Sequence, residues 1–163
     1  ANVGRFCIQM FSPDALAGGA YTTYAGTCST VAPTFADGPP GAGTLVGLRS
    51  MAFDGRFGGG GGPLYVTDSG SSRVRVAWPN GTLSTLAGNG SSFSIDGVGA
   101  SASFSGPWGI ASDAAGNVFV ADYNTGLLRK IFADTAVVAQ AGGAIVAGAR
   151  SNLCESIRHV SCP

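Results

Sequence analysis

The chain has 163 residues, enough for one domain with a sizeable core. Only 11% of the residues are charged, 27 are glycine, and nine acidic residues balance nine basic ones. This composition excludes a charged helical protein, and the lack of a basic stripe argues against a nucleic-acid partner. No apolar run reaches the roughly 18 residues that a membrane-spanning helix needs, so no membrane-spanning helix is expected. Short β-branched runs between glycine and serine turns indicate an all-β fold.

The N-terminal segment, residues 1–40, is interpreted as part of a sheet followed by a connecting loop. Arg5–Ile8 resembles Arg73–Val76, and Ala20–Gly26 resembles Gly81–Gly88. The sequence begins at Ala1 without a methionine and without a basic-then-apolar leader. Two explanations stay open: a signal peptide has been removed, or the sequence is a piece of a longer chain.

The middle of the chain, residues 41–143, contains a repeated unit. Asp68 and Arg75 recur as Asp122 and Arg129, 54 residues later. Upstream of these residues the copies are 59 residues apart, as Asp37 and Asp96 show. The two spacings differ by five residues, which is the length of the run Gly58–Gly62. This run is interpreted as a flexible loop inserted into the earlier copy. A repeat of this length with four short apolar segments predicts one four-stranded propeller blade per copy.

The later copy, between Ser101 and Gly142, gives the clearest strand pattern. Short apolar runs bounded by glycine, asparagine and aspartate favour strands over helices. We expect one antiparallel sheet with strands near 107–112, 117–122, 127–132 and 136–141. Gly41–Gly88 is expected to form a second sheet that superposes on it.

These segments resemble the NHL repeat. The residues that carry the resemblance are Ala87-Gly88, Asp96-Gly97-Val98-Gly99, Pro107-Trp108-Gly109-Ile110-Ala111, Gly116–Asp122 and Arg129-Lys130-Ile131. The earlier copy is looser, with Thr67 in place of Ala and Val76 in place of Lys. The resemblance covers residues 20–143 and implies a β-propeller with the Pro-x-Gly-Ile strand nearest the axis. It implies no particular chemistry, because this scaffold carries many functions.

The chain therefore holds two blades and part of a third, an incomplete propeller of two to three blades. Propellers close with about four to eight blades, so these cannot close alone. Beyond Gly143 the pattern stops, and residues 144–163 are expected to form an irregular tail held by a disulfide.

Four cysteines suit an oxidising compartment, and they allow three pairings. We favour Cys7 with Cys28 and Cys154 with Cys162. A zinc site is the alternative, but the chain has no C-x-x-C pair and His159 is its only histidine. Two sequons, at Asn80 and Asn89, agree with secretion, although Asn-Gly is also a favoured turn dipeptide.

No residue set indicates catalysis, so the protein is not expected to be an enzyme. Aspartates that recur beside turn residues are interpreted as turn caps that accept backbone N–H bonds; they are Asp37, Asp54, Asp68, Asp96, Asp113 and Asp122. One histidine does not support a Ser–His–Asp triad or a zinc site of several histidines. Trp78 and Trp108 would suit stacking on a sugar ring, but we favour packing roles for both, with Trp108 between blades and Trp78 over an outer strand.

Two functions follow from the sequence. The first is a non-catalytic extracellular structural protein, carrying N-linked glycans and using no cofactor, whose blades pack against other copies as a ring or a filament. Contacts between unlike faces give a filament when their rotation does not close. The second is a fragment of a larger secreted NHL-propeller enzyme, receptor or ligand-binding protein.

Overall fold

The structure is a computed structural model that describes residues 7–12, 20–28, 34–57, 61–133, 136–141 and 144–145. For residues 11–12, 136–141 and 144–145 it describes the backbone alone. The expected tail, including Cys154, His159 and Cys162, lies outside these ranges apart from its first two residues.

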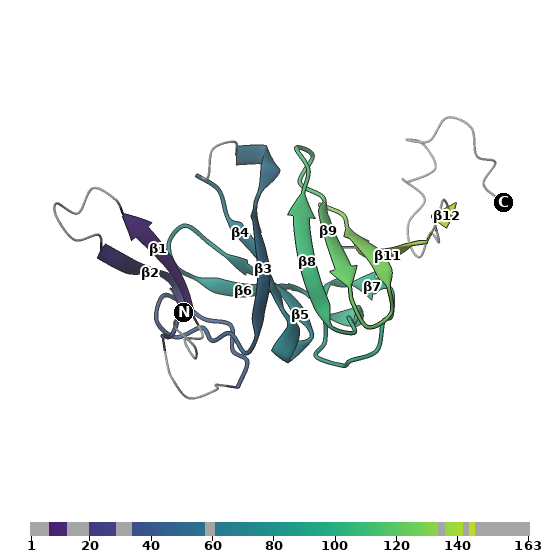
Figure 1. Ribbon diagram of the computed structural model, residues 1–163, viewed down its shortest axis with the longest axis horizontal. Coiled ribbons are helices and arrows are strands. Elements are labelled where there is room, and N and C mark those ends of the chain that lie inside the picture. Colours follow the sequence, from purple (N-terminus) through teal and green to yellow (C-terminus); the bar gives the residue numbers. More distant parts are fainter. Residues whose placement is uncertain are drawn as a thin grey trace.

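Three antiparallel sheets follow one another along the chain and lie side by side in a row (Figure 1). The first hairpin consists of β1 (Cys7–Ser12) and β2 (Ala20–Gly26). The first blade consists of β3 (Leu48–Phe53), β4 (Leu64–Asp68), β5 (Arg73–Ala77) and β6 (Leu83–Ala87). The second blade consists of β8 (Pro107–Ser112), β9 (Val118–Asp122), β10 (Leu127–Ile131) and β11 (Ala136–Ala141).

The helical segments of the described chain are single 3-10 turns at Gly55–Phe57, Ser69–Ser71 and Gly99–Ser101. The fold is all-β with propeller-like blades, as expected, and the four strands predicted between residues 107 and 141 are present. Gly116 shows why the turn residues matter. Its φ of +85° ends the turn before β9, and a side chain there would collide with Arg56 of the first blade.

The two blades have the same register. Thr67 pairs with Val74 in the first blade, and Ala121 pairs with Leu128 at the matching place in the second. Both innermost strands also carry an irregularity at the same point, between Leu48 and Met51 in β3 and between Pro107 and Ile110 in β8. The repeat in the sequence is therefore a repeat of strand pairing, and residues of one blade can be compared with their equivalents in the other.

The second blade has two strands beyond the four expected. β7 (Gly97–Val98) and β12 (Ala144–Ile145) both pair with β11. In the first blade, Gly38 makes the equivalent bridge to Leu83 of β6. The Asp-Gly segment thus pairs with the outermost strand of each blade, as a short strand in the second blade and as a single bridge in the first.

The first hairpin pairs in the same way as the two outer strands of the first blade. Its pairing shifts between Ile8 and Gln9, as the β5–β6 pairing shifts between Val74 and Arg75. Ile8 pairs with Ala25 as Val74 pairs with Ala87, so Ile8 is the equivalent of Val74. The alignment expected from the sequence, which sets Ile8 over Val76, is wrong by two positions. A shift of two leaves every side chain on the same face, so the hydrophobic pattern does not separate the two registers.

Two apolar clusters fill the spaces between successive sheets. The first, between the first hairpin and the first blade, consists of Ile8, Ala25, Leu45, Leu64, Val66, Ala77 and Leu83. The second, between the two blades, consists of Tyr65, Val74, Val76, Ala87, Ala102, Phe104, Val118, Val120 and Ile131. Each blade is held by the face it shares with its neighbour, so a blade with no neighbour on one side leaves that face uncovered.

Candidate functional site

A buried arginine stands at the same place in each blade. In the first blade, Arg75 has no exposed side-chain surface and lies 2.7 Å from Asp37 and 3.3 Å from Asp68. It also donates to the backbone oxygens of Ala36 and Thr44. A fully buried guanidinium with several acceptors is a structural group, because its charge is already compensated.

The second blade repeats the ion pairs and the backbone acceptors of this network. Arg129 lies 2.7 Å from Asp96 and 3.4 Å from Asp122, and it donates to the backbone oxygens of Ile95 and Ser103. In both blades the arginine joins the Asp-Gly rim segment to the end of the second strand. The recurring carboxylates therefore hold the blade together.

The prediction that the recurring aspartates cap turns is right for some positions and incomplete or wrong for others. Asp113 caps a turn by accepting the backbone N–H groups of Ala115 and Asn117. Asp68 accepts the N–H groups of Val46 and Gly47 but is also paired with Arg75, so there the interpretation is incomplete.

Asp54 accepts the backbone N–H of Arg56, as a turn cap does. At Asp37, Asp96 and Asp122 the side chain instead pairs with the buried arginine of its blade. Asp122 accepts from Ser94 and Arg129, and Asp37 and Asp96 pair with Arg75 and Arg129. The cap interpretation of these three is therefore wrong. The signal that would have revealed the network is Arg75 and Arg129 recurring in register with the aspartates.

Asp54 forms a third buried cluster, at the opposite end of the first blade. Its carboxylate lies 2.6 Å from the Arg56 guanidinium and accepts a 2.8 Å bond from the Tyr65 hydroxyl. The bond from Arg56 lowers the pKa of Asp54 to about 2. Burial, together with the bond to Asp54, raises the pKa of Tyr65 to about 12. Both groups keep one protonation state at neutral pH, and neither is poised for proton transfer.

Acid should weaken the first blade through Asp54. Because its pKa is lowered on folding, the stabilisation is fully present above about pH 4 and is lost as the pH falls towards about 2. Thermal unfolding should show that the free energy of unfolding falls between pH 6 and pH 2. The fall should be about 1–2 kcal/mol smaller in Asp54→Asn than in the unaltered chain. An Asp54→Asn variant with the same acid dependence as the unaltered chain would contradict this assignment.

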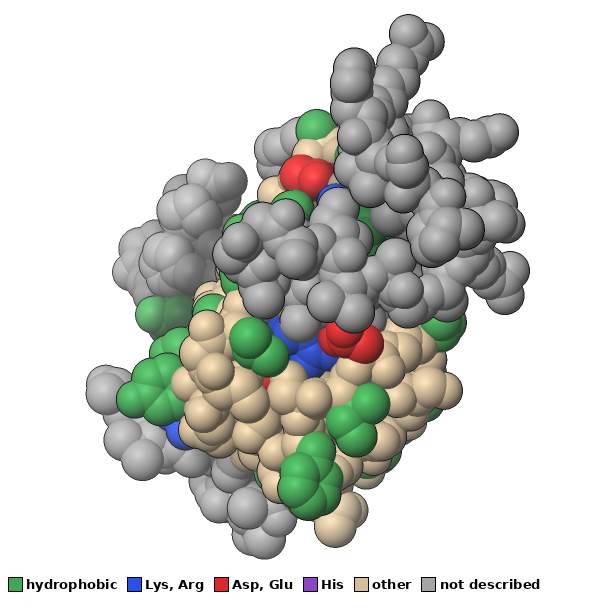
Figure 2. Space-filling view, turned by 90° about the vertical axis from the view of Figure 1, so that its right-hand side faces the viewer, with side chains coloured by type: hydrophobic (Ala, Val, Ile, Leu, Met, Phe, Trp, Pro, Cys, Tyr) green, Lys and Arg blue, Asp and Glu red, His purple; other side chains and the backbone are tan. Residues whose placement is uncertain are grey.

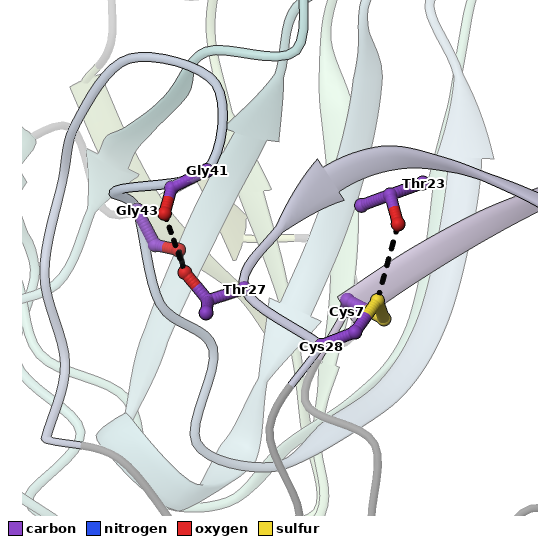
Figure 3. Close-up of a disulfide and its surroundings, with 6 residues drawn as sticks. All are labelled: Cys7, Thr23, Thr27, Cys28, Gly41 and Gly43. Atoms are coloured by element: carbon purple, nitrogen blue, oxygen red, sulfur yellow. Dashed lines mark hydrogen bonds between the residues drawn. A yellow bond between two sulfur atoms is a disulfide. The ribbon is translucent and has the colours of Figure 1, made fainter.

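A disulfide joins Cys7 in β1 to Cys28 just after β2, with the Cα atoms 4.9 Å apart (Figure 3). Beside it, Thr27 donates its hydroxyl to the backbone oxygens of Gly41 and Gly43, which ties the end of the hairpin to the segment leading into the first blade. This is the pairing expected from the sequence. Cys154 and Cys162 lie outside the described residues, so their pairing stays a prediction.

Removing the disulfide should loosen the hairpin. The bond closes a loop with a sequence separation of 21, for which the stabilisation is about 3 kcal/mol. Cys7→Ser with Cys28→Ser should lower the free energy of unfolding by about that amount, and amide hydrogen exchange should accelerate first in β1 and β2. Unchanged protection of these two strands would show that the bond is not needed to hold them.

Both sequons lie in exposed turns. The side-chain oxygen of Asn80 accepts the N–H of Thr82, and that of Asn89 accepts the N–H of Ser91. Their side chains are exposed at the rims of the sheets, where an oligosaccharide has room. Glycosylation of Asn80 and Asn89 stays a prediction.

Trp108 forms an exposed aromatic cluster where the two innermost strands meet. The Arg49 guanidinium of β3 lies 4.5 Å from the Trp108 ring, and the ring of Tyr123 lies 5.1 Å away. Trp108 is 46% exposed and Tyr123 is 68% exposed. The tryptophan thus bridges the blades, but it also presents aromatic surface to solvent, which suits a ligand with a flat apolar face. Trp78 covers the β5–β6 hairpin and donates its ring N–H to Ser84.

Among the described residues, one face of the second blade packs against the first blade and the other has no neighbouring sheet. Val118, Val120 and Ile131 point towards the first blade and are buried. The opposite face carries Phe119, Ala121, Leu128 and Lys130, which we call the uncovered face. Leu128 is 48% exposed and Ala121 is exposed. Figure 2 looks onto the molecule from the side of this blade and shows hydrophobic side chains at the surface among polar groups.

The first blade shows what this face looks like when it is covered. The equivalents of Phe119, Ala121, Leu128 and Lys130 are Tyr65, Thr67, Val74 and Val76, from the matching register of the two blades. All four are at most 5% exposed, because the second blade packs over them. The same positions are thus buried where a following blade exists, and half-buried or exposed where none is described.

No group of three or more His, Cys, Asp or Glu side chains in the described ranges is arranged to hold a metal ion. Nor does a helix among these residues have the length and apolar character to cross a membrane.

Comparison with known families agrees with the blade geometry. Residues 104–131, which run from the loop before β8 to the end of β10, match the NHL repeat model. The curated proteins contain no match to the sequence.

Solved structures give the same fold. An auxiliary nutrient binding protein from Bacteroides ovatus is similar to 85% of the chain at 26% identity with a TM-score of 0.65. One from Bacteroides thetaiotaomicron covers 85% at 18% identity with a TM-score of 0.57. A third structure, a protein of unknown function from the same species, covers 82% at 22% identity with a TM-score of 0.59. The chain spans about a third of the length of these proteins.

Proposed function

We propose that this NHL-repeat chain is a non-catalytic extracellular protein that works by packing its blades against further blades, supplied by other copies of itself. One observation carries the proposal. Positions that are at most 5% exposed in the first blade have equivalents in the second blade that are partly or largely exposed, Leu128 to 48%. An uncovered sheet face with apolar side chains is costly in isolation and favours association.

The contact joins two different surfaces. The uncovered face of one copy meets the first hairpin of the next, which is the other end of the row of sheets (Figure 1). Such a head-to-tail contact gives a ring when its rotation closes and a filament when it does not. The disulfide and the exposed sequons support an extracellular location, because disulfides persist there and N-linked glycans are found on secreted proteins.

A charge placed on the uncovered face tests the proposal. Leu128→Asp should prevent association and leave a folded monomer, because an aspartate buried there would lack a partner. Ile95→Asp is the matched control, since Ile95 is similarly exposed at 53% but lies at the blade rim. Light scattering after size exclusion should show assembly for the control alone. Equal association of both variants would overturn the proposal.

A second function is favoured by the Trp108 cluster. The chain is 26% identical to a protein described as nutrient binding, and the Arg49–Trp108–Tyr123 group offers exposed aromatic faces beside a cation. In this alternative the chain is part of a longer propeller that binds a small ligand at this cluster. Titration calorimetry with neutral oligosaccharides should show binding that Trp108→Ala abolishes. No heat of binding with the unaltered chain would exclude neutral oligosaccharides as its ligand.

A further inference from the structure

Arg49 and Trp108 occupy the same place in the repeat, one in each blade. The residues that precede them, Leu48 and Pro107, pair with the last residues of β4 and β9. Because β3 and β8 are neighbours, the two side chains meet, with the Arg49 guanidinium 4.5 Å from the Trp108 ring (Figure 1). The Thr67 hydroxyl donates to the backbone oxygen of Trp108 at 2.7 Å, which holds the start of β8 against the first blade. The blades thus place a cation and an aromatic ring side by side.

The guanidinium of Arg49 has no carboxylate or backbone oxygen as an acceptor among the described residues, and it lies over the Trp108 ring instead. The other arginines in the described ranges all donate to carboxylate or backbone oxygens; they are Arg56, Arg73, Arg75 and Arg129. The Arg49 side chain is also exposed. A guanidinium held over an aromatic ring keeps its N–H donors for another partner. Arg49 is therefore a positioned cation that can receive an anion.

The carboxylates that lie nearest in the fold do not compete for Arg49. Asp68 and Asp122 are the last residues of β4 and β9, at the same end of the blades. Neither has exposed side-chain surface, and each is paired with the buried arginine of its own blade. Because their charges are already compensated, Arg49 is the exposed charge at these strand ends.

From these observations we infer that Arg49, Trp108 and Tyr123 bind an acidic polysaccharide, with a sugar ring on the aromatic surface and its carboxylate on Arg49. The inference rests on the ligand-binding function proposed as the second candidate, and it names the class of ligand. A sugar ring has an apolar face of C–H groups, which suits the exposed surface of Tyr123 and Trp108. A sugar carboxylate can accept two N–H groups of one guanidinium side by side.

The shape of this cluster favours a polymer over a single sugar. Trp108 is 46% exposed and Tyr123 is 68% exposed, so one sugar ring would be covered on one side only. Sites for small molecules usually enclose most of the ligand surface. Further units of a polymer can extend across the ends of β3 and β8, and each additional contact then forms within one bound molecule.

A galacturonate tetramer and its methyl ester test the inference, because they share the sugar rings and differ in charge. In titration calorimetry at low salt, the charged tetramer should bind the unaltered chain about tenfold more tightly than the ester. Arg49→Gln should reduce the ratio of the two affinities to about one, and Arg49→Lys should keep part of the preference. Lys130→Gln, which removes a cation from the uncovered face, is the matched control and should leave the ratio unchanged.

The aromatic and ionic contributions are separated by two further measurements. Trp108→Ala should abolish binding of both tetramers, whereas Trp108→Phe should keep the preference for the charged one. Added salt should weaken binding of the charged tetramer and leave the ester unaffected, because exposed ion pairs are screened.

Equal affinities for the charged tetramer and the ester would overturn the inference and leave the ligand-binding function standing. A preference for the charged tetramer that survives Arg49→Gln would also overturn it, because the cation would then lie elsewhere. If neither tetramer bound, the inference would fall together with a carbohydrate-binding function for this cluster.

Discussion

Replacing Arg129 by methionine is expected to lower the free energy of unfolding by about 3–5 kcal/mol, because Asp122 would remain buried without its cation. Arg129 and Asp122 have no exposed side-chain surface, and Asp96 is 29% exposed. Methionine fills part of the space, so the loss reflects the uncompensated charge more than a cavity. Urea unfolding followed by circular dichroism gives the difference.

Two further variants separate the charge effect from general damage. Arg129→Met combined with Asp122→Asn should recover part of the loss, since the second change removes the unpaired charge. Arg49→Met should cost less than about 1 kcal/mol, because Arg49 is exposed and its guanidinium lies over the Trp108 ring, away from any buried carboxylate. A loss below about 1 kcal/mol for Arg129→Met would show that the network does not hold the blade.

The covered and uncovered faces should respond differently to the same substitution. Tyr65→Ala is expected to cost about 3–5 kcal/mol, since Tyr65 is 5% exposed in the cluster between the blades and its hydroxyl bonds to Asp54. Phe119→Ala, at the equivalent position of the second blade, should cost about 1 kcal/mol in the monomer, because the side chain is only half-buried. Both are measured by urea unfolding in the Leu128→Asp background, which keeps the chain monomeric.

The gap between these two values is the informative quantity. A large gap means that the second blade has no neighbour on its outer face. Equal losses would indicate that Phe119 is packed as tightly as Tyr65, and the uncovered face would then not be available to a second copy.

The strands could be predicted from the sequence because their signals are local. Val118–Asp122 lies between turn residues that cannot continue a strand, and its apolar run is of strand length. The 54-residue spacing then fixed which residues of the two blades are equivalent. The first hairpin was harder, because its register differs from the expected one by two positions, and that shift leaves the hydrophobic pattern unchanged.

The long-range polar contacts could not be predicted from local patterns. Asp122 stands beside a turn, as a capping residue would, yet its partner Arg129 is fixed by the pairing of β9 with β10. Local sequence patterns therefore predict the individual strands. The buried polar contacts and the exposed faces depend on how those strands pair.

Sedimentation equilibrium of the unaltered chain tests the central claim most directly. The mean mass should rise with concentration from about 1 to about 100 µM, to several times that of one chain, because association follows mass action. The Leu128→Asp variant should keep the mass of one chain over the same range. An unaltered chain that stays a folded monomer at every concentration would contradict the claim that the second blade presents a docking face for another copy.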